Sequence, residues 1–130
     1  MNVFYEEDGV FKVGTILADN DNTLRVEAAH GKRSKIKAGW LLFRFEDPGK
    51  AHFMEQSQQA AASIDTDFLW SCCGEEEFGY EALAREYFGR QPSPVEAAGL
   101  LIRLHGSPMY FYKKGRGRYK AAPPEALKAA

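Results

Sequence analysis

The sequence predicts an α+β protein, in which a small SH3-like β-barrel is followed by a helical, winged-helix-like unit that carries a basic β-hairpin wing. Three observations lead to this fold class. Short β-prone runs recur at intervals of about 8–12 residues in the first third of the chain, capped helix-forming runs follow, and two β-prone arms then flank a pair of glycines. We therefore expect a barrel over residues 1–47, a helical domain over 48–121, and the start of a linker or helix over 122–130.

The barrel is predicted from five short runs that turn formers separate. Residues 10–17 are rich in β-branched and aromatic side chains, and residues 24–28 alternate apolar with charged side chains, as a half-buried strand does. Four consecutive Asp and Asn residues at 19–22 separate these two runs. Closing so few strands into a barrel would protect the edges that an open sheet exposes.

The helical domain is predicted from its start and stop signals. Ser93, Pro94 and Glu96 form a capping box with proline at the first helical position, and the helix that they open runs over 95–105. Gly89 ends the preceding helix. Helix, turn, helix and hairpin then follow one another in the order of a winged helix.

The net charge of −1 conceals an uneven distribution. Residues 1–48 carry 7 basic and 8 acidic side chains, residues 49–90 carry 3 and 8, and residues 91–130 carry 7 and 2. The chain is therefore dipolar, with a basic C-terminal third.

The predicted hairpin is the sharpest local feature, because five cations lie within eight residues and alternate with tyrosines. Cations bind phosphates and exposed aromatic faces stack on unpaired bases, so this pattern predicts an RNA-binding surface. Its expected residues are Lys113, Lys114, Arg116, Arg118, Lys120, Tyr110, Tyr112 and Tyr119. A solvated basic wing whose aromatic rings pack on the helices is the alternative.

A weaker basic run lies in the presumed barrel. Strand alternation places Lys35 and Lys37 on one face, opposite Ile36, and both lysines are added to the expected RNA-binding set. A charged edge that discourages aggregation explains the same pattern equally well.

Catalytic and metal-binding patterns are missing from these residues. The sequence has no Gly-x-Ser-x-Gly, Walker or His-Glu-x-x-His motif, and its two cysteines and three histidines lack zinc-ligand spacing. We expect no catalytic residue, metal site or cofactor here. A disulfide between the adjacent Cys72 and Cys73 would close almost no loop and so could not stabilise a fold, and we expect a reduced, cytoplasmic protein. No apolar run approaches the ~18 residues of a membrane span, so we expect no membrane partner.

Three stretches together resemble the N-terminal region of bacterial ribonuclease II-type exoribonucleases, the RNB family: residues 78–89, residues 93–98 and residues 109–119. Residues 8–17 and 37–43 resemble the small barrel that opens some members. The resemblance implies a parent enzyme that degrades single-stranded RNA from 3′ to 5′, with magnesium held by aspartates of a catalytic domain. None of those aspartate positions exists in this chain, so the catalytic domain is expected beyond Ala130.

The hypothesis that follows is an accessory module that binds single-stranded RNA and guides it to a downstream catalytic domain, which it contacts within the same chain. Two alternatives remain. A protein-interaction or docking module would use the acidic middle segment against a basic neighbour. A winged-helix DNA-binding regulator is less favoured, because residues 95–105 are mostly apolar and a major-groove helix needs polar side chains that reach base edges.

Overall fold

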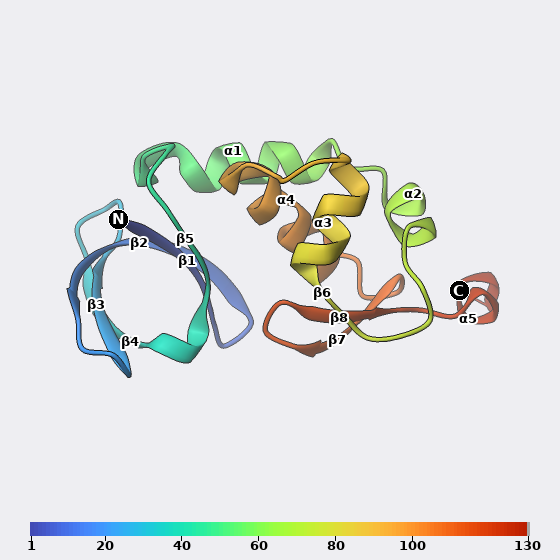
Figure 1. Cartoon of the computed structure of the whole chain (residues 1–130), viewed down its shortest axis with the longest axis horizontal. Coiled ribbons are helices and arrows are strands. Elements are labelled where there is room, and N and C mark those ends of the chain that lie inside the picture. The colour runs from blue at the N-terminus through green and yellow to red at the C-terminus, as the bar shows by residue number, and fades with distance from the viewer. Residues whose placement is uncertain (130) are drawn as a thin grey trace. The chain divides into compact units, whose positions relative to one another are not determined.

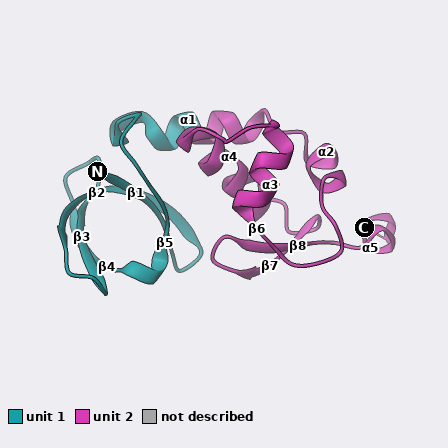
Figure 2. Ribbon diagram, viewed as in Figure 1, with its two compact units in different colours: residues 1–56 teal, residues 57–130 magenta. Residues whose placement is uncertain are grey.

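The computed structural model describes residues 1–129, which form two compact units (Figure 2), Met1–Gln56 and a second unit that begins at Ser57. The chain is mixed α and β, which confirms the predicted class. The first unit is built on a five-stranded antiparallel sheet, and the second contains helices and a three-stranded sheet (Figure 1).

The five-stranded sheet of the first unit follows the five predicted β-prone runs. Its strands have the order β4-β3-β2-β1-β5, and each neighbouring pair is antiparallel. A short 3₁₀ turn, Ala38–Trp40, precedes the last strand. The sheet curves strongly (Figure 1). The strands are β1 (Asn2–Glu7), β2 (Val10–Asp19), β3 (Thr23–Glu27), β4 (Arg33–Lys37) and β5 (Leu41–Phe45).

Strand β1 is buried on both faces, which explains its run of apolar residues. Val3 and Tyr5 pack with Leu24, Val26 and Ile36 on one side. On the other side, the ring of Phe4 stacks on Phe11 and Phe43 at centroid distances of 5.3 and 5.2 Å.

Helix α1 (Lys50–Ala62) completes this aromatic cluster. Phe53 is fully buried, and its ring stacks on Phe45 with the centroids 4.2 Å apart. The first unit therefore extends to Gln56 rather than ending at the expected residue 47, because Phe53 covers rings that would otherwise face water.

The helices of the second unit begin and end at the signals that the sequence contains. Asp65 caps α2 (Thr66–Ser71) by accepting a hydrogen bond from the Phe68 backbone N–H. Helix α3 (Tyr80–Phe88) ends at Gly89, whose φ of 71° suits glycine. Helix α4 (Pro94–His105) has the predicted capping box between Ser93 and Glu96.

Helix α4 packs closely on the C-terminal part of α1. A Cβ added at Gly99 would lie 2.8 Å from the Ala60 Cβ, 3.0 Å from the Ala61 backbone nitrogen and 3.1 Å from the Ser57 carbonyl oxygen. The two helix backbones approach this closely because the facing residues are small.

The second sheet has the order β6-β8-β7, with helices α3 and α4 on one side of it (Figure 1). Its strands are β6 (Phe78–Gly79), β7 (Phe111–Gly115) and β8 (Arg118–Ala121), so the expected hairpin is confirmed and β6 is an addition. Ala122 is buried and its N–H donates to the Tyr110 carbonyl, which keeps the segment after β8 within this unit. The expected terminal helix is α5 (Pro124–Ala129).

Candidate nucleic-acid interface

The β7–β8 hairpin divides its side chains between two faces. Phe111 lies opposite Ala121 and Tyr112 lies opposite Lys120 in the antiparallel register. Phe111 and Ala121 are buried, whereas Tyr112 is 39% exposed and Lys120 is exposed. The register therefore places an aromatic ring beside a cation on the solvent face.

A groove of about 700 Å³ lies along this part of the hairpin. Tyr112, Lys114 and Lys120 line it from the hairpin. Its other walls come from the end of α2, which contributes Trp70, and from the segment after β8, which contributes Pro123. The lining thus combines aromatic rings, two prolines and two ammonium groups with the carboxylates of Glu75 and Glu125. Rings beside cations suit a ligand with both flat bases and phosphates.

Trp70 is fixed by a hydrogen bond that joins distant parts of the chain. Its indole Nε1 donates to the carbonyl oxygen of Ala122 at 2.8 Å. This bond satisfies the polar end of the indole, which is half-buried, and ties α2 to the segment that follows β8. The groove wall is therefore held in place by the fold.

The other two predicted tyrosines are not part of the groove lining. Tyr119 has none of its surface exposed and belongs to the core, so the expectation that it contacts RNA is wrong. The Tyr110 hydroxyl donates to Asp67 Oδ1 at 2.7 Å, and this hydrogen bond raises the pKa of the phenol. Strand alternation explains Tyr119: it points to the same face as the buried Ala121.

The predicted cations are spread over different surroundings. Lys114 and Lys120 line the groove, while Lys113 and Arg116 are exposed near the turn and outside the groove lining. The Arg118 Nε donates to Glu77 Oε2 at 2.5 Å, so its charge is partly neutralised.

Lys35 and Lys37 belong to β4 in the first unit, and both are exposed. Ile36 between them is buried, as the alternation predicts. These two lysines therefore belong to the first unit, whereas the hairpin groove belongs to the second.

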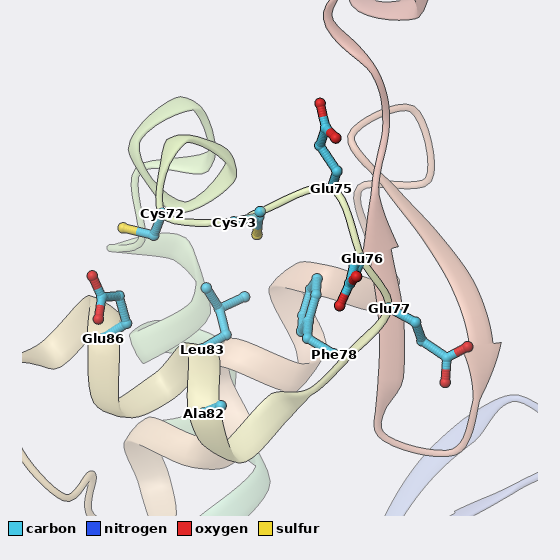
Figure 3. Close-up of a pocket in the computed structure, with 10 residues that line it drawn as sticks. Cys72, Cys73, Glu75, Glu76, Glu77, Phe78, Ala82, Leu83 and Glu86 are labelled. Carbon is cyan, nitrogen blue, oxygen red and sulfur yellow. The ribbon is translucent and has the colours of Figure 1, made fainter.

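An acidic hollow of about 490 Å³ borders the groove, and Cys73, Gly74 and Glu75 line both. Figure 3 shows Glu75, Glu76 and Glu77 pointing in different directions from their loop, while Leu83 and Glu86 rise from α3. The carboxylates do not converge, and among residues 1–129 no group of three His, Cys, Asp or Glu side chains could hold a metal ion.

The thiols of Cys72 and Cys73 in this hollow are free and half-buried. Burial raises the pKa of Cys73 to about 11, and the neighbouring Cys72 adds to this effect. Burial and the carboxylate of Glu86 raise the pKa of Cys72. Both shifts favour the protonated thiol, which is the less reactive form of cysteine.

Helix α4, the helix that a winged-helix regulator would use for recognition, does not present a reading surface. Six of its residues are buried, and they form most of its apolar face: Ala97, Ala98, Gly99, Leu100, Leu101 and Leu104. This burial agrees with the expectation that the helix serves packing, and it leaves few side chains for the base edges of a duplex.

Comparisons with models of protein families, with curated proteins and with solved structures find no match to this chain. Within the described part of the chain, no helix has both the length and the apolar character to cross a membrane.

Sequence reasoning did not find the second wall of the groove. Trp70 lies far from the hairpin in sequence, and no periodicity or motif connects it with the hairpin, whereas Pro123 comes soon after β8 but carries no signal of its own. A lone tryptophan at the end of a short helix is the one local signal, because large aromatic residues are common at binding surfaces.

Proposed function

We propose that this chain binds single-stranded RNA in the hairpin groove. The observation that carries the proposal is the exposed ring of Tyr112, which lies opposite Lys120 in the sheet and shares the groove with Lys114 and Trp70. A base stacks on the tyrosine, and the flanking phosphates meet the two ammonium groups.

A single strand suits this groove better than a duplex. Stacking on Tyr112 needs the face of an unpaired base, which a duplex hides. The buried face of α4 supports the same choice, because the helix that would enter a major groove is committed to the core.

The wider proposal is that the chain is the N-terminal accessory region of a ribonuclease II-type exoribonuclease in the cytoplasm. In it, the first unit is an SH3-like barrel and α3, α4 and the β7–β8 wing form a winged helix. The module guides RNA to a catalytic domain outside residues 1–130 and contacts that domain. Magnesium and the 3′-to-5′ hydrolysis belong to that domain.

The direct test is fluorescence anisotropy with a labelled single-stranded RNA of about ten nucleotides. Tyr112→Ala removes the stacking surface, and stacking is worth about 1–3 kcal/mol, so affinity falls roughly 5- to 150-fold. Lys120→Glu also weakens binding, and the slope of log affinity against log salt becomes shallower by at least about 0.7.

Two matched variants serve as controls. Tyr110→Phe removes only the hydroxyl that bonds to Asp67, and Lys128→Glu makes the same charge change on α5, outside the groove lining. Both should bind RNA nearly as the parent chain does. If Tyr112→Ala and Lys120→Glu bind no worse than these controls, the groove is not the RNA site.

The proposed parent activity has a separate test. A 5′-labelled RNA should stay intact with residues 1–130 alone and should be shortened from its 3′ end by the longer gene product with magnesium. If the longer product leaves the RNA intact, the proposed exoribonuclease activity is contradicted, while the proposal that the groove binds RNA is unaffected.

Docking on a protein is the second candidate function, and the acidic hollow favours it. Its carboxylates surround an apolar floor that includes Phe78 and Leu83, which suits a basic partner surface. Pull-down of a separately expressed downstream domain tests this role, and Glu86→Lys should weaken capture. If RNA binds but the downstream domain is not captured, the docking role is contradicted and the groove proposal is unaffected.

A further inference from the structure

The β3–β4 hairpin of the first unit carries two cations directly opposite each other. In the antiparallel register Arg25 lies across from Lys35, and both are exposed. Their neighbours Leu24, Val26 and Ile36 are buried, so the two cations are fixed on the outer face. Like charges directly opposite across two strands destabilise a sheet.

No carboxylate relieves this repulsion. The acid of the hairpin, Glu27, is engaged by Arg33 at 3.1 Å and by Lys50 at 3.6 Å. Those interactions lower the pKa of Glu27, so its carboxylate stays ionised and paired with Arg33 and Lys50. Within residues 1–129, neither Arg25 nor Lys35 forms an ion pair.

A third cation extends the same face along β4. Lys37 follows Lys35 at the next outward position, and its Nζ lies 5.9 Å from the centroid of the Trp40 ring. On the other side of Arg25, β2 presents the small Ala18, which leaves the row of cations open. Same-face residues on a strand are about 7 Å apart, a separation comparable to that of successive phosphates in an extended strand.

The two hairpins are alike in charge. Residues 23–37 contain five basic side chains and one acid, and residues 110–120 contain five basic side chains and none. The side chains that β3–β4 presents at Arg25, Lys35 and Lys37 are exposed cations, so a ligand on this face is recognised mainly by charge.

We propose that the outer face of β3–β4, formed by Arg25, Lys35 and Lys37, binds the phosphate backbone of a second stretch of the RNA. The ligand class rests on the proposed function, whereas the site is separate from the groove. Arg25 is the new member, because the sequence run that indicated Lys35 and Lys37 did not include it. A strand long enough to reach both hairpins binds more tightly through their combined contacts.

Arg25→Glu is the test variant, because it separates binding from folding. It places opposite charges across the strands, so the free energy of unfolding stays the same or rises. Lys12→Glu makes an equal charge change elsewhere in the same unit, where it replaces the exposed ion pair with Glu7 by two neighbouring carboxylates.

Anisotropy is measured with a short RNA of about six nucleotides and a long one of about thirty, because one binding fold covers about 4–16 nucleotides. Arg25→Glu should weaken binding of the long RNA about tenfold more than Lys12→Glu does, and should leave the short RNA within about twofold. Lys120→Glu should weaken both.

The outcomes distinguish the two proposals. If Arg25→Glu and Lys12→Glu bind the long RNA equally while Lys120→Glu weakens both RNAs, the second site is overturned and the groove stands. If Arg25→Glu weakens binding of the long RNA while Lys120→Glu changes neither RNA, the β3–β4 site stands and the groove proposal fails.

Discussion

Three tyrosines within ten residues of this chain have three different roles. Tyr112 is exposed in the groove, Tyr110 is bonded to Asp67 and Tyr119 is buried in the core. In the sequence Tyr112 and Tyr119 each adjoin a cation, and only the strand register tells these two apart. A basic and aromatic run is therefore evidence for a nucleic-acid surface only at the positions that face solvent.

Gly99 shows how a single missing Cβ determines a helix contact. Alanine is the better helix former by about 1 kcal/mol, yet a Cβ here would meet backbone atoms of α1 that cannot move aside. We expect Gly99→Ala to lower the free energy of unfolding by about 1–3 kcal/mol, measured by urea denaturation.

Gly39→Ala is the matched control, because nothing lies within 4 Å of its added Cβ. It should change stability by less than about 0.5 kcal/mol. A Gly99→Ala protein as stable as this control would show that the two helices are less closely packed than the structure indicates.

At the scale of elements, α4 depends on the capping box at its first turn. The Ser93 Oγ accepts from the Glu96 N–H, and Glu96 Oε1 accepts from the Ser93 N–H at 2.9 Å. Hydrogen bonding from Arg90 is the largest cause that lowers the pKa of Glu96, to about 2. The carboxylate is thus stabilised in the folded chain.

This lowered pKa makes the contribution of Glu96 depend on pH. The contribution is fully present above the ordinary value of 4.5 and is lost as pH falls toward about 2. In urea unfolding, the stability advantage of the parent chain over Glu96→Gln should shrink below pH 4.5. Ser93→Ala should cost about 1 kcal/mol at neutral pH. An advantage that stays constant down to pH 2 would contradict this account of the box.

The elements themselves were largely predictable from the sequence, because local signals determine them. Strand alternation, the Ser93 cap and the Gly89 stop act within a few residues. Strand β6 was missed, since two residues give no periodicity. The groove was found only in part, because the Trp70 bond to Ala122 joins residues 52 apart in the chain.

At the scale of the molecule, carboxylates and cations from different segments of the second unit lie close enough to interact. Glu77 neutralises Arg118, and Glu75 lines the groove beside the two lysines. RNA phosphates therefore compete with the protein's own carboxylates for its cations.

Glu77→Gln tests this competition. Glu77 and Arg118 are 44% and 52% exposed, so the pair contributes at most about 1 kcal/mol to stability. Releasing Arg118 should raise RNA affinity roughly two- to fivefold by anisotropy.

Glu86→Gln removes the same charge from the acidic hollow, away from the groove lining, and is the matched control. It should raise RNA affinity less than Glu77→Gln does. Equal gains would mean that overall charge, rather than the pair with Arg118, sets the effect.

The burial of Phe53 on α1 determines which segment of this chain a gene rearrangement could transfer intact. The boundary between the units falls inside a helix, and the part of that helix before the boundary supplies a ring to the strands that precede it. A gene rearrangement that moved only residues 1–47 into another protein would leave Phe45 without its stacking partner. Recombination that preserves the first unit must therefore carry the opening turns of α1 as part of the same exchanged segment.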